Sequence, residues 1–187
     1  MNIDVYEQIP VMESEKFLLR GIEDTDAEDL FKVYSDKEAA PLFNSDNCVD
    51  NFYYVSMEEM KNTLTYWKRE YQSRYYVRWT IVDKSMDCAM GTIELFNRKA
   101  KDYFNNCGLL RLDLRSDYET QDTIEDILGI IIPKTRDMFA CEMIATKAVS
   151  IAQERIQALE HMGFCLSEEA LIGHDGTKYD SYYVREV

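Results

Sequence analysis

Five carboxylates fall within ten residues, immediately before a run of apolar residues with helical spacing. They are Asp117, Glu119, Asp122, Glu125 and Asp126. Carboxylates in the first turn of a helix can cap its free amides and complement its dipole. They also repel phosphate, since a carboxylate about 5 Å from a phosphate charge costs roughly 3 kcal/mol at an effective dielectric of about 20. The cluster predicts a helix start that its own acids stabilise and that disfavours an anionic ligand.

Two further carboxylates lie inside runs that predict strands. Glu94 belongs to CAMGTIELFNR (88–98), and Asp113 belongs to GLLRLDLRS (108–116), where leucine alternates with charge. A carboxylate placed beside a cleft can serve as a general base. The alternative is that each is a solvent-facing residue of an alternating strand.

Other common sites are not indicated. His161 and His174 are too far apart in the chain to suggest a metal site, and no GxSxG or Walker loop points to a hydrolase or nucleotidase. The five cysteines are odd in number and contain no CxxC pair. They predict reduced, mostly buried thiols rather than disulfides or a zinc site.

The elements that must position these groups follow a simple order. Residues 16–23 predict a strand, and a helix follows that Asp24 or Thr25 can cap. A helix over 57–73, with Ser56 as its cap, carries an apolar and aromatic stripe that predicts core packing, with cleft-facing aromatics as the alternative. The remaining elements are strands at 75–84, 88–98 and 108–116, a helix that Pro133 ends or kinks, a strand at 141–149, a helix at 151–163 closed by Gly163, and two strands after 164.

The chain is acidic, with 21 lysines and arginines against 35 acidic residues and a net charge of −14. This field opposes nucleic-acid binding and would attract a cationic substrate such as an amine, a peptide N-terminus or a polyamine. No basic leader with an apolar run and no apolar stretch of about 20 residues is present. The sequence therefore predicts a cytoplasmic protein without membrane attachment.

This order of elements resembles the GNAT N-acetyltransferases over residues 10–187. KFLLRGIEDTDAEDLFKVYSD (16–36) is similar to the opening of the branch that acetylates ribosomal-protein N-termini and small amines. MGTIEL (90–95) and IQALEHMGF (156–164) are similar to its third strand and to its helix before the sixth strand. The resemblance implies one α/β domain over 1–187, with helices on both faces of a mixed, mostly antiparallel sheet of six to seven strands. It also implies transfer of an acetyl group from acetyl-CoA to a primary amine by direct attack.

In that superfamily the fourth strand separates from the fifth to admit the pantetheine arm, and the following turn offers N–H groups to the pyrophosphate. By position these are residues 108–116 and 118–124. The implied acetyl-CoA contacts are Leu112, Leu114, Glu119, Thr120, Gln121, Asp122, Thr123, Ile124 and Arg155. The implied catalytic groups are Glu94 or Asp113 as base, the backbone N–H of Leu114 or a neighbour as carbonyl donor, and Tyr118 as acid for the thiolate, unless Tyr118 only packs.

The turn departs from the superfamily motif, which has Gln or Arg, two residues, Gly, one residue, then Gly or Ala. Here it is ETQDTI (119–124), and no defining position matches. Arg155 stands where many relatives have serine, and it can bind a CoA phosphate or simply be a solvated charge. Two functions remain open. One is an N-acetyltransferase acting on a small amine or peptide N-terminus. The other is a non-catalytic binding or regulatory module that has lost acyl-CoA binding, for which a homodimer is one form.

Overall fold

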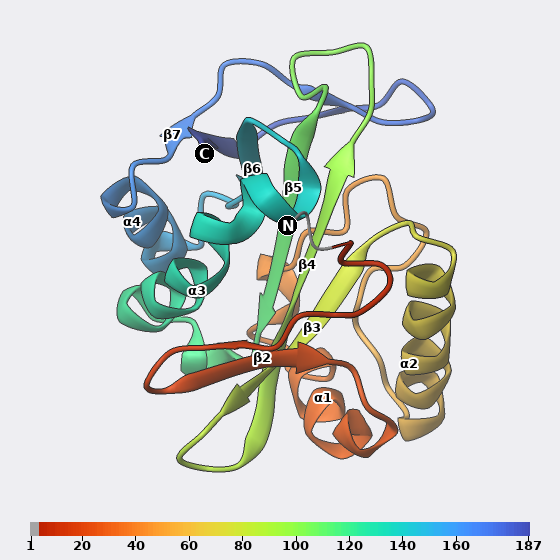
Figure 1. Ribbon diagram of the computed structural model, residues 1–187. Helices are drawn as coiled ribbons and strands as arrows, with labels where there is room; N and C mark the ends of the chain where they lie inside the picture. The colour runs from red at the N-terminus through yellow and green to blue at the C-terminus, as the bar shows by residue number, and fades with distance from the viewer. Residues whose placement is uncertain (1–3) are drawn as a thin grey trace.

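The computed structural model describes residues 4–187, so the first three residues of the domain expected over 1–187 lie outside the described part. Its strands are β1 (Met12–Glu13), β2 (Phe17–Gly21), β3 (Val77–Asp83), β4 (Cys88–Arg98), β5 (Cys107–Leu114), β6 (Met143–Lys147), β7 (Cys165–Leu166), β8 (Leu171–Ile172), β9 (Lys178–Tyr179) and β10 (Tyr182–Glu186). Eight of them form one sheet in the order β1-β2-β3-β4-β5-β6-β10-β7, and β8 pairs with β9 (Figure 1). Within the large sheet β5 and β6 are parallel, and every other neighbouring pair is antiparallel.

Helices cover both faces of this sheet (Figure 1). α1 (Ala27–Tyr34) and α2 (Met57–Gln72) lie on one face, and α3 (Gln121–Phe139) and α4 (Gln153–His161) lie on the other. α2 begins after the expected Ser56, whose hydroxyl accepts from the Glu59 N–H while the Glu59 carboxylate accepts from the Ser56 N–H. α4 is followed by Gly163 with a φ of 82°, which glycine adopts without strain. The predicted α/β class and mostly antiparallel sheet are confirmed.

Several details differ from the prediction. Of the two effects expected of Pro133, ending the helix is wrong: α3 continues to Phe139, because Thr135 and Phe139 beyond the proline are buried and hold the helix by packing. The large sheet has eight strands because two-residue strands, β1 and β7, extend its edges, and the tail after residue 164 forms four short strands instead of two. Of the five thiols, only Cys107 and Cys141 are fully buried.

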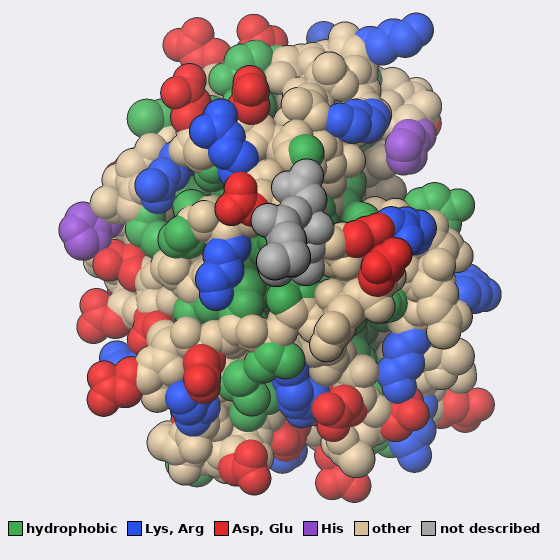
Figure 2. All heavy atoms as spheres, in the orientation of Figure 1, with side chains coloured by type: hydrophobic (Ala, Val, Ile, Leu, Met, Phe, Trp, Pro, Cys, Tyr) green, Lys and Arg blue, Asp and Glu red, His purple; other side chains and the backbone are tan. Residues whose placement is uncertain are grey.

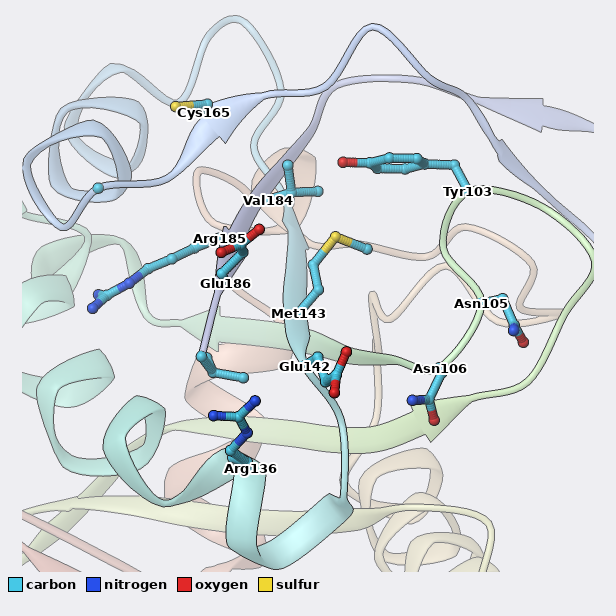
Figure 3. A pocket seen from close by; sticks show the side chains of 12 residues that line it. Tyr103, Asn105, Asn106, Arg136, Glu142, Met143, Cys165, Val184, Arg185 and Glu186 are labelled. Carbon is cyan, nitrogen blue, oxygen red and sulfur yellow. The ribbon is translucent and has the colours of Figure 1, made fainter.

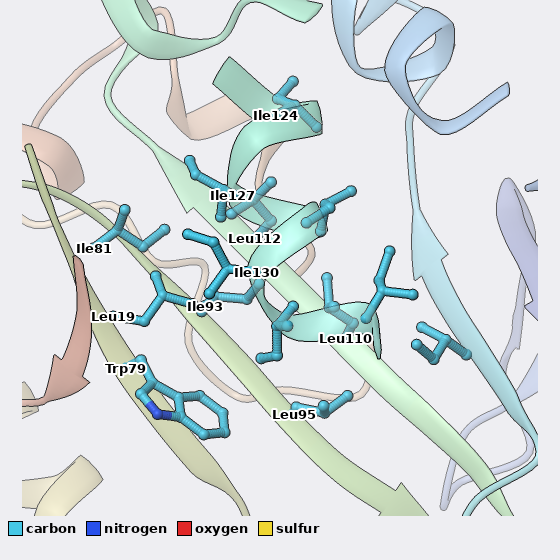
Figure 4. Close-up of a cluster of buried hydrophobic side chains, with 14 of the residues drawn as sticks. Leu19, Trp79, Ile81, Ile93, Leu95, Leu110, Leu112, Ile124, Ile127 and Ile130 are labelled. Atoms are coloured by element: carbon cyan, nitrogen blue, oxygen red, sulfur yellow. The ribbon is translucent and has the colours of Figure 1, made fainter. Parts of the chain in front are cut away.

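The two faces of the central strands differ in chemistry, because successive side chains of a strand point to opposite sides. One face packs against α3 through an apolar cluster that includes Trp79, Ile93, Leu112 and Ile127 (Figure 4). The opposite face, under α1 and α2, carries a row of buried polar side chains. They are Arg78, Thr80, Thr92, Glu94, Arg111 and Asp113.

Charged side chains of both signs are interspersed over the face shown in Figure 2. The excess of carboxylates is therefore not gathered into one patch there, and the charge around each cavity depends on its own residues. No helix within residues 4–187 combines the length and apolar character that crossing a membrane requires.

Gly91 of β4 lies directly against the backbone of β5. A Cβ atom at this position would lie 2.3 Å from the backbone oxygen of Asp113. Gly91→Ala must therefore push the two strands apart, and we expect it to lower the free energy of unfolding by about 1–3 kcal/mol.

Urea unfolding followed by circular dichroism measures this loss. Gly129→Ala is the matched control, since a Cβ there meets nothing within 4 Å and alanine is favoured over glycine in a helix by roughly 0.5–1 kcal/mol. If Gly91→Ala unfolds at the same urea concentration as the wild type, the close approach of β4 and β5 is wrong.

Candidate functional site

β5 separates from β6 after Leu110, and this break in the pairing of the two strands is here called the groove. The two strands pair from Cys107 opposite Met143 to Leu110 opposite Thr146, and the last four residues of β5 have no partner in β6. The resemblance places the pantetheine arm of acetyl-CoA in such an opening. Leu112 and Leu114 therefore lie on the expected edge, with their side chains buried.

The guanidinium of Arg155 binds the part of β5 that has no partner in β6. Its Nε and Nη2 donate to the two carboxylate oxygens of Glu119 at 2.6 and 2.7 Å, and its Nη1 donates to the backbone oxygen of Leu112 at 2.8 Å. The residue is only 2% exposed, so the expectation of a solvated charge is wrong. The spacing of residues in α4 could have predicted this burial, because Arg155, Ala158 and Leu159 lie on the same face of the helix and that face is buried.

The N-terminus of α3 is also occupied by protein side chains. Thr120 is the N-cap, and its hydroxyl accepts from the Thr123 N–H at 3.4 Å. Glu154, from α4, accepts from the Gln121 N–H at 2.8 Å. A carboxylate thus stands where the resemblance expects pyrophosphate, but it comes from α4 and not from the acidic cluster itself.

The clustered carboxylates have other partners. Asp117 binds Arg115, Glu119 binds Arg155, and Glu125 binds Gln121 and His161. Hydrogen bonds from Gln121 and His161 lower the pKa of Glu125 below its ordinary value. Asp122 lies in the first turn of α3, where a negative charge complements the helix dipole.

Glu94 and Asp113 do not face solvent. Each is 1% exposed. Together with Arg78 and Arg111 they form a network of buried charges under α1 and α2, here called the charged ladder. Glu94 accepts from Arg78 at 2.5 Å and from Arg111 at 2.8 Å, and Asp113 accepts from Arg78 at 3.1 Å and from the Tyr34 hydroxyl at 2.8 Å. The expectation of solvent-facing strand residues is therefore wrong, because α1 and α2 cover this face.

The pKa values of the two carboxyls are shifted in opposite directions. Burial by itself raises the pKa of Glu94, but the guanidinium groups of Arg78 and Arg111 bring that pKa below its ordinary value. Burial raises the pKa of Asp113, and the opposing effect of Arg78 does not cancel it. Glu94 is thus an anion held by two cations, which makes it a weak base.

Tyr118 is not brought together with either carboxyl. Its hydroxyl donates to Asp83 at 2.9 Å, and no hydrogen bond joins it to Glu94 or Asp113 among residues 4–187. Burial, followed by the hydrogen bond to Asp83, raises its pKa to about 12.

The segment 42–47 crosses the open side of the groove, a contact that sequence reasoning missed because these residues have no periodic pattern. The backbone oxygen of Asp46 accepts from Arg111 of β5 at 3.0 Å, and its carboxylate accepts from Lys147 of β6 at 2.6 Å and from Tyr182 of β10 at 3.1 Å. The backbone oxygen of Leu42 accepts from Arg155 at 3.4 Å. This segment therefore connects the separated strands.

A cavity of about 740 Å³, here called the aromatic cavity, lies on the α1 and α2 side of the sheet. Phe52, Tyr66, Trp67 and Tyr76 contribute its aromatic lining. Its charged lining is balanced, with Arg78 and Arg111 against Asp50 and Glu94. Trp67 of the apolar stripe in α2 is buried and also lines this cavity, so both interpretations of the stripe apply to it. Within residues 4–187 no three histidine, cysteine or acidic side chains are arranged to hold a metal ion.

A separate cavity of about 790 Å³ lies at the opposite end of β6 (Figure 3). Charged side chains of both signs line it, including Arg136, Glu142, Arg185 and Glu186. None of the residues implicated by the sequence lies there.

The ladder can be tested by comparing Glu94→Gln with Asp113→Asn. Removing the Glu94 charge leaves two buried guanidinium groups without their shared anion, and we expect a loss of about 3–5 kcal/mol in unfolding free energy at neutral pH. Asp113→Asn should cost less, since the pKa of Asp113 is raised and an amide oxygen still accepts from Tyr34.

The pH dependence has a definite sign. Because the folded-state pKa of Glu94 is lowered, its contribution is complete above the unfolded value of about 4.3 and is lost as the pH falls further. The deficit of Glu94→Gln should therefore shrink at acid pH. Urea unfolding from pH 3 to 7 tests this, and equal, pH-independent losses for both variants would contradict the assigned charges.

No protein-family model and no curated protein sequence matches this chain. Solved structures do match it. A GNAT-family acetyltransferase from Bacillus anthracis has a TM-score of 0.69 at 10% identity, covering 95% of this chain and 98% of its own. The ribosomal-protein-S5-alanine acetyltransferase from Vibrio fischeri has a TM-score of 0.67 at 16% identity, covering 95% and 96%. The microcin C7 self-immunity acetyltransferase MccE, in complex with acetyl-CoA and AMP, has a TM-score of 0.68 at 14% identity, covering 93% and 94%. Residues 4–187 therefore have the fold of the GNAT acetyltransferases.

Proposed function

We propose that this chain is a binding protein built on the GNAT fold, in which Arg155 and Glu119 have replaced acyl-CoA in the groove between β5 and β6. The observation that carries the proposal is the buried, two-point ion pair of Arg155 with Glu119, completed by the bond from Arg155 to the Leu112 backbone oxygen. The groove is thus closed by groups that satisfy one another.

Opening the groove to a pantetheine arm would be costly. Arg155 would have to leave, and Glu119 would lose its partner. Breaking a buried ion pair costs about 3–5 kcal/mol, which corresponds to roughly a hundredfold to several thousandfold in affinity. A pyrophosphate at the α3 N-terminus would also meet the Glu154 carboxylate already bound to the Gln121 N–H.

The hydrogen-bond partners of the implied catalytic groups also support a binding role rather than catalysis. Glu94 has its carboxylate oxygens bound to Arg78 and Arg111, and Asp113 is buried beneath Tyr34. Tyr118 donates to Asp83. None of these groups is free to take a proton from an amine or to give one to a thiolate.

Acetyl transfer from acetyl-CoA to a primary amine is the second candidate. The observation in its favour is the fold shared with acetyltransferases, one of which was solved with acetyl-CoA bound. In this case Arg155 would leave Glu119 to bind a CoA phosphate, and the amides of residues 119–124 would face the pyrophosphate.

Isothermal titration with acetyl-CoA separates the two functions. We expect no heat of binding from the wild type at hundreds of micromolar. Arg155→Ser combined with Glu119→Gln removes both occupants of the groove, and this double variant should bind acetyl-CoA at least tenfold more tightly than the wild type.

The matched control is Lys84→Ser with Glu13→Gln, which removes an exposed ion pair of the same charges on another edge of the sheet. This control variant should show the same absence of acetyl-CoA binding as the wild type. Low-micromolar binding of acetyl-CoA by the wild type would overturn the proposal and favour the acetyltransferase.

A further inference from the structure

A second cavity adjoins the aromatic cavity and has the opposite charge balance to the chain as a whole. This basic cavity, of about 990 Å³, shares Asn47, Cys48, Tyr66, Tyr76 and Arg111 with the aromatic cavity, so the same side chains border both. Its charged lining comprises Arg74, Arg98, Lys99, Lys101 and Arg111 against Asp46, Glu70 and Asp102. Cations outnumber carboxylates here, in a chain with 21 cations and 35 carboxylates.

Two of the carboxylates in this lining are neutralised by the protein. Asp102 forms a two-point pair with Arg98, and Asp46 pairs with Lys147. The exposed lysines at the rim differ: Lys99 contacts only the side-chain oxygen of Asn106, and Lys101 has no ion pair among residues 4–187. Arg74, Arg98 and Arg111 are themselves paired with Asp4, Asp102 and Glu94. The uncompensated positive charge at the rim therefore comes from Lys99 and Lys101.

Arg111 lies at the junction of the two cavities and has unused hydrogen-bonding capacity. Its side chain is nine-tenths buried, and its Nε has no hydrogen-bond partner within residues 4–187. A buried donor without a partner is costly, so a shift of Arg111 that let this atom reach an acceptor in the cavity would be favourable.

Aromatic rings adjoin these cations. Tyr66 and Tyr76 line both cavities, and Phe52 and Trp67 extend the lining inward. Tyr66 and the nearby Tyr75 are exposed. Flat aromatic surface next to cationic groups suits a ligand that carries a ring and a negative charge.

We infer that the two adjoining cavities bind a small aromatic anion, with its ring against Tyr66 and Tyr76 and its phosphate or carboxylate at Lys99, Lys101 and Arg111. The inference rests on the proposed binding function and names its ligand class. It reverses the expectation of a cationic substrate, because a ligand within a few ångströms of the rim responds to those lysines, while distant charges are screened by salt.

Three probes with one ring and different charged groups test the ligand class. They are phenyl phosphate, benzoate and phenethylamine, and inorganic phosphate measures the anion without the ring. Binding is followed by the ligand-induced change in tryptophan fluorescence. This change reports on Trp67, which lines the aromatic cavity, because Trp79, the second tryptophan, packs on the opposite face of the sheet. We expect at least one of the two aromatic anions to bind tenfold or more tightly than phenethylamine and inorganic phosphate. Whichever anion binds more tightly identifies the preferred charged group.

Variants test the position of the ligand. Lys99→Gln with Lys101→Gln should weaken the bound anion about tenfold, and Tyr66→Ala should weaken phenyl phosphate or benzoate but not inorganic phosphate. Lys16→Gln with Lys134→Gln is the matched control, since neither lysine lines the cavities. Unchanged thermal melting shows that each variant is folded.

Equal or tighter binding of phenethylamine overturns the inference, as does absence of binding by both aromatic anions at millimolar concentration or an equal loss in the control variant. A different measurement shows whether the proposed function fails. It requires acetyl-CoA to bind the wild type, a result that does not depend on Lys99, Lys101 or Tyr66.

Discussion

Buried backbone groups must find hydrogen-bond partners. The separation of β5 from β6 beyond Leu110 leaves such groups of β5 without partners in β6. In this chain the protein itself supplies the partners. Arg155 donates to Leu112, Glu119 holds Arg155, and Glu154 accepts from the first amide of α3. The positions of α4, the α3 N-terminus and the segment 42–47 all depend on this internal closure.

The charged ladder on the other side of the sheet also consists of buried groups that need partners. α1 and α2 cover strands whose polar positions carry two arginines and two acids, so these charges had to be paired. Burying such groups is costly unless every charge meets an opposite one, and Glu94 between Arg78 and Arg111 meets this condition. The same arginines then form part of the aromatic cavity, so a structural network also borders the space available to a ligand.

Net charge and local charge give opposite expectations for the ligand. The chain is strongly acidic overall, yet two of the three carboxylates beside the basic cavity, Asp102 and Asp46, are held by Arg98 and Lys147. Lys99 and Lys101 remain exposed. A ligand inside the cavity responds mainly to these neighbours, because salt screens charges beyond about 10 Å.

The sequence by itself determined the order of elements, the α/β class, the three-strand meander and the Ser56 cap, because these follow from local periodicity and from short-range hydrogen bonds. The resemblance to the GNAT acetyltransferases, rather than periodicity, placed the expected opening beside residues 108–116 and the altered turn at residues 119–124. Tertiary structure alone decided that Arg155 is buried against Glu119, that Glu94 and Asp113 belong to a ladder under α1 and α2, and that the segment 42–47 joins β5, β6 and β10. Each of these contacts links residues more than fifteen positions apart, and a charged side chain carries no local signal of which distant charge it will meet.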